Sequence, residues 1–175
     1  MIAPIIVTAL MGAHDFAALD TLRRAHFPPE RNVLRAHLTM FHHLPPSVGH
    51  ELTGLLQDEA RGNSPQARLA SLINLGGGVA FSVDSSELED IRARIADRFA
   101  SMLMPQDRNA WRPHVTIQNK VKPPEARALV DKLSIDFRPR SLTLLGLAAF
   151  YYRGGLWEPI AAFAFGTGRK ITAPI

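Results

Sequence analysis

The chain has 175 residues, of which 46% are hydrophobic and 21% are charged, and its formal net charge is +4. This length suffices for one compact domain, and this composition excludes an intrinsically disordered chain. The chain contains no cysteine, which excludes disulfides, cysteine-ligated zinc and thiol nucleophiles. The small positive excess is compatible with a polyanionic partner such as RNA.

The first expected element is a strand over residues 5–10. Pro4 and the β-branched residues after it favour a strand over a signal peptide, which would need a basic N-terminal region. No segment approaches the roughly 20 apolar residues of a membrane span, so we expect a cytoplasmic protein without a membrane partner. A helix over residues 16–27 should follow the strand.

The next elements surround the tripeptide His37-Leu38-Thr39, whose apolar neighbours predict a strand. A pair of prolines at 45–46 then opens an amphipathic helix over residues 48–56. Residues 68–75 and 79–83 should form a hairpin that turns at the glycines 76–78.

The same order of elements recurs in the second half of the chain. A helix with apolar Leu88, Ile91, Ile95 and Phe99 on one face should begin at a cap on Asp84 or Ser85. Further on come the tripeptide His114-Val115-Thr116, prolines at 123–124 and a helix over residues 126–133. A second hairpin, over residues 142–152 and 156–165, should turn at glycines 154–155.

The two tripeptides extend to Arg-x-His-x-Thr and lie 77 residues apart, and the prolines and glycine turns recur at nearly the same offset. The repeats span approximately residues 4–78 and 79–165. They predict one α+β domain over residues 1–175, with two pseudo-symmetric lobes around a central cleft. Each lobe should contain helices and an antiparallel-rich sheet.

Side chains two apart on a strand share a face, so each histidine should point the same way as its threonine. Two such strands facing each other would offer two imidazoles as acid and base, and two hydroxyls as donors to the oxygens of a phosphodiester. This chemistry requires no metal or cofactor. On the same faces we expect possible substrate contacts, namely Arg35, Phe41, Arg112 and Lys120.

These residues also allow other interpretations. The histidines 37, 42, 43 and 50 suggest a metal site, but a regular strand would put His42 on the face opposite His37. The glycines 76–78 lack the Lys-Ser/Thr of a phosphate-binding loop. For the aromatic residues Phe41, Phe81, Trp111, Tyr151, Tyr152 and Trp157, stacking on a base is possible, but the core is favoured.

With two apolar-flanked His-x-Thr motifs in a duplicated chain, the sequence resembles the 2H phosphoesterase superfamily, which includes 2',5' RNA ligases and RNA 2',3'-cyclic phosphodiesterases. The resemblance implies that His37 and His114 are the acid/base pair and that Thr39 and Thr116 hold the phosphate. By analogy, His114 would activate water and His37 would protonate the leaving oxygen, although the near symmetry leaves this assignment open. The residues 41–43 depart from the basic and aromatic pair found in many relatives.

The resemblance therefore predicts a monomeric, metal-independent phosphodiesterase that acts on the 2',3'-cyclic phosphate of an RNA 3' end or on a small cyclic nucleotide. A related 2',5' phosphodiester is also a possible substrate. Two alternatives remain open, namely an RNA 2',5' ligase that uses the same residues and a binding module for RNA or nucleotides without turnover.

Overall fold

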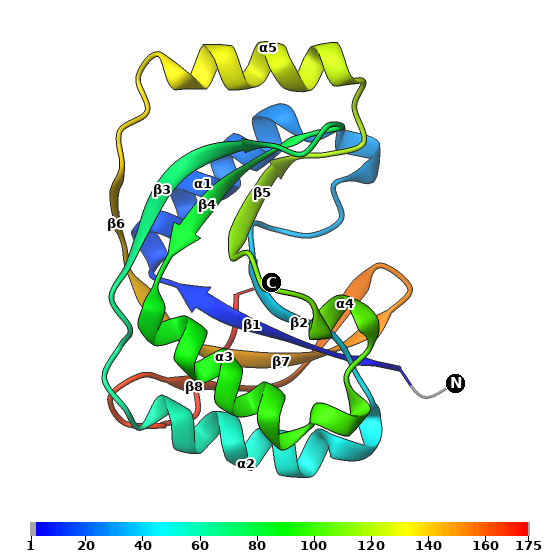
Figure 1. Ribbon diagram of the computed structural model, residues 1–175, viewed down its shortest axis with the longest axis vertical. Coiled ribbons are helices and arrows are strands. Elements are labelled where there is room, and N and C mark those ends of the chain that lie inside the picture. The colour runs from blue at the N-terminus through cyan, green and yellow to red at the C-terminus, as the bar shows by residue number, and fades with distance from the viewer. Residues whose placement is uncertain (1–2, 175) are drawn as a thin grey trace.

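The computed structural model describes residues 3–174, which fold into helices around one antiparallel sheet. The strands are β1 (Ile5–Met11), β2 (Leu38–Leu44), β3 (Ala67–Asn74), β4 (Val79–Asp84), β5 (His114–Gln118), β6 (Arg140–Leu142), β7 (Leu144–Arg153) and β8 (Leu156–Ala164). They form an eight-stranded sheet in the order β6-β3-β4-β5-β2-β1-β7-β8 (Figure 1). Each pairing between neighbours in this order is antiparallel. The predicted α+β class is confirmed.

The predicted helices are present, with small shifts at their ends. They are α1 (Ala13–His26), α2 (Gly49–Ala60), α3 (Ser86–Arg98), α4 (Pro105–Arg108) and α5 (Pro123–Ser134), and short 3-10 turns occupy Pro29–Arg31, Pro46–Val48 and Ala100–Met102. Of the two predicted caps of α3, Ser85 is the one used, because its hydroxyl accepts a hydrogen bond from the N–H of Leu88 at 3.2 Å. The sequence pattern missed α4, which is short and polar.

Both predicted hairpins form, β3–β4 and β7–β8. In the first turn, Gly76 has φ +84°, a conformation that favours glycine. Two residues on, a Cβ atom at Gly78 would lie 2.0 Å from the carbonyl oxygen of Gln118. Glycine is therefore required here because β5 runs close to the turn.

The sheet consists of two half-sheets that meet at one residue pair. The β1 half-sheet contains β2, β1, β7 and β8, and the β3 half-sheet contains β6, β3, β4 and β5. Between them, β2 and β5 pair in register only at Leu38 and Val115. The two sequence halves exchange strands, because β3 pairs with β4 and β6 while β7 pairs with β1. Each half-sheet thus draws strands from both halves of the chain.

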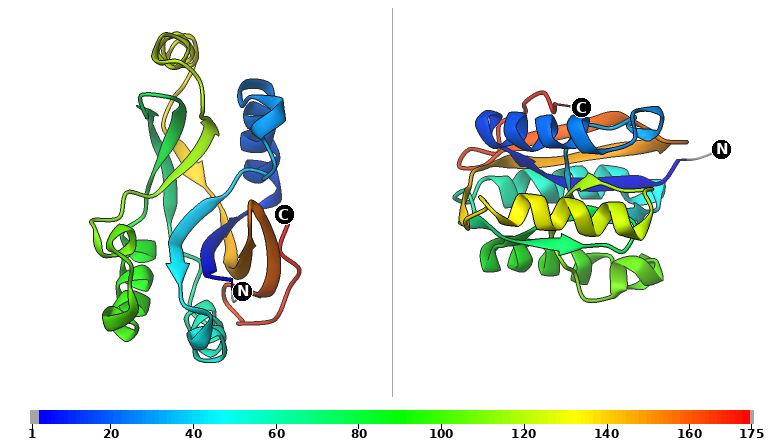
Figure 2. Two further views of the ribbon diagram at one scale, coloured as in Figure 1. Left: turned by 90° about the vertical axis from the view of Figure 1, so that its right-hand side faces the viewer. Right: turned by 90° about the horizontal axis from the view of Figure 1, so that it is seen from above.

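The helices cover the two half-sheets at opposite ends of the molecule. Helices α1 and α5 lie beside β3, β4 and β5, while α2 and α3 lie at the other end, where α2 packs on β7 and β8 (Figures 1 and 2). All residues of β1 are buried, because the main core covers one face of the strand and a smaller apolar cluster, which includes Leu10, Phe150 and Ala173, covers the other. Among the helices within residues 3–174, none is long and apolar enough to span a membrane.

Candidate active site

The two His-x-Thr motifs lie side by side at the junction of the half-sheets. Leu38 and Val115 are completely buried, whereas the histidine and threonine on either side of each are only half-buried. Because antiparallel partners run in opposite directions from the Leu38–Val115 pair, each threonine lies across from the histidine of the other motif. The fold therefore brings all four polar side chains of the motifs onto one face.

These side chains open into a cleft of about 950 Å³. Of the sequence-predicted site residues, His37, Thr39, Arg112, His114 and Thr116 line it. The remaining lining residues are His42, Arg92, Gln106, Asp107, Ala110, Trp111 and Trp157. The cleft thus contains several groups that can carry positive charge and one carboxylate.

Both motif histidines are held in the same way. The Nδ1 atom of His37 lies 2.7 Å from the carbonyl oxygen of Arg35, and Nδ1 of His114 lies 2.7 Å from the carbonyl oxygen of Arg112. A carbonyl oxygen can only accept a hydrogen bond, so Nδ1 must donate in each ring. The Nε2 atom of each neutral ring is then an unprotonated acceptor, which is the form that a general base requires.

The imidazole ring of His37 is enclosed by its neighbours, although its motif lines an open cleft. Its ring packs on Trp157, with 4.7 Å between the ring centroids and 57° between the planes. Burial lowers the pKa of His37 to about 4, the hydrogen bond to Arg35 opposes this shift, and the charge of Arg23 adds to it. The imidazole of His37 is therefore neutral at neutral pH.

Two arginines from the helices hold the motif strands where their pairing stops. Arg23 of α1 donates from Nη1 to the carbonyl oxygen of Thr116 at 2.9 Å and from Nε to that of Leu34 at 2.9 Å. Arg92 of α3 donates from Nε to the carbonyl oxygen of Met40 at 2.8 Å. These side chains satisfy carbonyl groups where β2 and β5 no longer pair with each other, so the half-sheets can separate without leaving these groups unpaired. Burial lowers the pKa of Arg23 to about 10.

The prediction that Phe41 contacts substrate is wrong. Strand β1 pairs Thr8 with Thr39 and then Val7 with Phe41, which leaves Met40 as an extra residue in a bulge. The bulge turns Phe41 into the core, where it is completely buried. It also brings His42 into the cleft, so the expectation that His42 lies on the face opposite His37 is wrong for the same reason.

Arg35 and Lys120, the two remaining predicted contacts, do not line the cleft, although Arg35 lines the smaller hollow on the other side of His37. The guanidinium of Arg35 binds Oδ2 of Asp20 at 3.0 and 3.1 Å and lies over the ring of Phe16. Lys120 follows the end of β5 in a turn with φ +63° and is exposed. Neither is among the residues that line the cleft, so Arg112 is the predicted cation that does line it.

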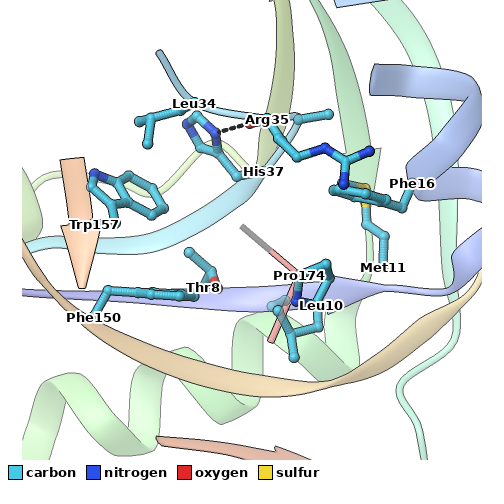
Figure 3. Close-up of a pocket in the computed structure, with 12 residues that line it drawn as sticks. Thr8, Leu10, Met11, Phe16, Leu34, Arg35, His37, Phe150, Trp157 and Pro174 are labelled. Atoms are coloured by element: carbon cyan, nitrogen blue, oxygen red, sulfur yellow. Dashed lines mark hydrogen bonds between the residues drawn. The ribbon is translucent and has the colours of Figure 1, made fainter. Parts of the chain in front are cut away.

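A second, smaller hollow of about 420 Å³ adjoins the cleft and shares His37 and Trp157 with it (Figure 3). Its walls are mostly apolar and include Leu10, Phe16 and Phe150. The Oγ1 atom of Thr8 in this hollow is buried and has no hydrogen-bond partner within residues 3–174. Trp157 therefore separates the open cleft from an apolar space behind His37.

The sequence pattern did not identify the groups that surround the motifs. Asp107 is 1% exposed and its carboxylate binds the backbone N–H groups of His42 and His43 at 2.9 Å each. A buried carboxylate gives no periodic signal in the sequence. The adjacent apolar pair Met40–Phe41, followed by two histidines, breaks strand alternation and could have indicated the bulge.

The described residues do not gather the side chains of a typical metal site. Within residues 3–174, no group of three or more His, Asp or Glu side chains is placed to hold a metal ion. Although His42 and Asp107 are neighbours, their contact is a hydrogen bond from the Nδ1 position at 3.2 Å.

The geometry defines a class of protein, namely an α+β fold in which two His-x-Thr strands are paired. Comparison with known protein families agrees with this class. Residues 12–155 match the model of the 2'-5' RNA ligase superfamily. The chain belongs to this superfamily, and the resemblance to 2H phosphoesterases is confirmed. No curated protein sequence matches the chain.

Solved structures share the fold at low sequence identity. The protein TT0787 of Thermus thermophilus is 17% identical with a TM-score of 0.63, over 94% of this chain and 98% of the other. E. coli LigT complexed with 3'-AMP is 14% identical with a TM-score of 0.61, over 94% of this chain and 99% of the other. A structure described as a phosphoesterase has the same identity, TM-score and coverage as that complex. Other structures of LigT hold NADP+, phosphate or ATP.

Proposed function

We propose that this protein hydrolyses a 2',3'-cyclic phosphate, or a closely related phosphodiester, of an RNA end or nucleotide without a metal ion. One observation carries the proposal: two imidazoles, each fixed through Nδ1 to a backbone carbonyl, line one cleft beside two threonines. General acid/base cleavage of a phosphodiester needs a proton acceptor and a proton donor of this kind. The complexes of LigT with 3'-AMP and phosphate support a nucleotide phosphate as the ligand class.

In the proposed reaction, His37 is the general base and His114 the general acid. His37 is neutral at neutral pH, so its Nε2 can take a proton from water as the water oxygen attacks phosphorus. His114 acts in its protonated form, in which Nε2 also carries a proton, and gives that proton to the ribose oxygen as the bond from phosphorus to that oxygen breaks. Departure of the 3' oxygen, as the family resemblance implies, leaves a 2'-phosphomonoester. This assignment reverses the one made by analogy, because burial disfavours the protonated form of His37.

Thr39 and Thr116 would donate hydrogen bonds to the nonbridging oxygens of the phosphate. Each lies across from the opposite histidine, and both threonines line the same cleft as the two imidazoles. Donors fixed in this way stabilise charge that redistributes over these oxygens in the transition state.

The test is hydrolysis of 2',3'-cyclic nucleotides, cyclic-ended oligonucleotides and 2',5'-linked dinucleotides in the presence of EDTA. We expect turnover of the cyclic substrates to be unaffected by the chelator. Loss of activity in EDTA that zinc restores would contradict the metal-free mechanism. The family also includes RNA ligases, so the products of 2',3'-cyclic phosphate ends mixed with 5'-hydroxyl ends should be analysed for joined RNA.

A further inference from the structure

The cleft holds a third histidine that the proposed reaction does not use. The side chain of His42 is 41% exposed and lines the cleft together with the two motif histidines. Its Nδ1 atom lies 3.2 Å from Oδ1 of Asp107. An ionised carboxylate only accepts hydrogen bonds, so Nδ1 donates and Nε2 is left for another partner.

Asp107 is held firmly in place from three sides. Its carboxylate accepts hydrogen bonds from the backbone N–H groups of His42 and His43, and its carbonyl oxygen accepts one from Nη2 of Arg92 at 2.8 Å. Burial favours the neutral acid, but the hydrogen bonds from His42 and His43 outweigh it and lower the pKa of Asp107. The fixed carboxylate orients the imidazole of His42 through Nδ1, and a phosphate oxygen would bind at Nε2 of a ring that carries both N–H groups.

The cleft has more cationic groups than one phosphodiester needs. A cyclic phosphodiester carries one negative charge, for which the two motif histidines and threonines suffice. His42 and Arg112 are additional, while the guanidinium of Arg92 is occupied by backbone carbonyl oxygens. Asp107 is the sole carboxylate among the lining residues within the described chain, and it already binds His42. Arg112 therefore adds a positive charge beside the motifs that the proposed reaction does not use.

We propose that His42, held by Asp107, forms a second phosphate subsite next to the paired motifs. The preferred substrate would be a 2',3'-cyclic nucleotide that carries another phosphate on its 5' oxygen, either as a terminal group or as the link to a preceding nucleotide. His42 lies three positions after Thr39, which spans at most about 10 Å of extended backbone, a distance suited to neighbouring phosphates of one substrate. The subsite rests on the proposed function for the identity of the reacting group.

The experiment compares kcat/KM for adenosine 2',3'-cyclic phosphate, its 5'-phosphorylated form and a dinucleotide ending in the cyclic phosphate. For the unmodified protein, we expect the additional phosphate to raise kcat/KM roughly tenfold or more, as for a hydrogen bond between charged groups. A higher kcat/KM for the 5'-phosphorylated mononucleotide alone would identify a terminal phosphate as the ligand. A higher kcat/KM for the dinucleotide would show that the subsite also accepts the phosphate that links two nucleotides of RNA.

The variant His42→Asn keeps a side-chain N–H toward Asp107 and removes the Nε2 atom. The ratio of kcat/KM with and without the additional phosphate should fall toward one in this variant. The matched control is His43→Asn, because His43 is an exposed neighbour that does not line the cleft, and its ratio should match that of the unmodified protein. Retention of the full ratio by His42→Asn would overturn the proposal, as would a ratio of one in the unmodified protein.

Binding measurements keep this proposal separate from the proposed function and from a folding defect. Adenosine 3',5'-bisphosphate should bind the unmodified protein more tightly than adenosine 3'-monophosphate, whether or not any substrate is hydrolysed. Equal affinities would overturn the second subsite even if hydrolysis is observed. Tighter binding of the bisphosphate without hydrolysis of any cyclic substrate would instead reject the proposed function and leave the subsite standing.

Discussion

The burial of His37 gives the first motif a property that its tripeptide does not reveal. A histidine in a polar motif beside a cleft is ordinarily expected to titrate near neutrality, but the enclosed ring has a pKa lowered to about 4. Trp157 is the aromatic contact of this ring and comes from β8, which is distant in sequence. The sequence could not predict this contact, because it depends on how β7–β8 returns beside β1.

We predict that Trp157→Ala shifts the acidic limb of the pH profile upward. If His37 is the base, kcat/KM of the unmodified protein should fall only as pH approaches about 4. Removing the indole exposes the imidazole to water, which weakens the burial effect and raises the pKa of His37. The measurement is kcat/KM between pH 4 and 8, with Trp157→Phe as a control that retains an aromatic cover. An acidic limb that stays in place in Trp157→Ala would argue against His37 as the titrating base.

At the scale of elements, buried arginines fasten the helices to the motif strands. Arg23 is 5% exposed, and its guanidinium joins α1 to the segment before β2 and to β5 through the carbonyl oxygens of Leu34 and Thr116. Arg92 connects α3 to β2 in a similar way. Each arginine therefore couples the position of a helix to the position of one motif.

Arg23→Lys should lower the free energy of unfolding by roughly 1–3 kcal/mol, because one ammonium group cannot reach all the acceptors and leaves a buried carbonyl unpaired. Denaturant titration measures this change. Arg24→Lys is the control, since the neighbouring side chain is 67% exposed, and it should change stability by less than about 0.5 kcal/mol. Equal stabilities of the two variants would show that the hydrogen bonds of Arg23 are not important for the fold.

The sequence predicted the secondary structure better than the surroundings of the site. Apolar periodicity identified α3 and α5, and the glycine turns identified both hairpins, because these signals are local. The bulge at Met40 and the burial of Arg23 and Asp107 depend on pairing and packing with distant segments. Of the candidate site, the two motifs and Arg112 were brought together in one cleft, whereas Phe41, Arg35 and Lys120 were not.

For the whole molecule, the exchange of strands makes each half of the chain dependent on the other. Strand β3 lies between β4 and β6, and β1 lies between β2 and β7, so in the first half alone β3 would lack both of its partners and β1 would lack one of its two. Repeats in a sequence do not reveal such an exchange, because equivalent strands look alike whether they pair within a half or across halves.

Residues 3–78 produced alone should therefore not fold cooperatively, despite corresponding to one sequence repeat. The fragment would expose the edge of β1 that pairs with β7 and both edges of β3, which pair with β4 and β6 in the complete chain. Thermal unfolding followed by circular dichroism compares the fragment with the full chain. A sharp cooperative transition of the monomeric fragment would contradict the interdependence of the two halves.

The most direct test of the paired-histidine mechanism is the activity of His37→Ala and His114→Ala, each measured in EDTA on the same 2',3'-cyclic substrate. If the imidazoles act as base and acid, each single variant should lose roughly 10²–10⁴-fold in kcat while still binding a nucleotide 3'-phosphate. A folded variant of either kind that retains the kcat of the unmodified protein would contradict the mechanism.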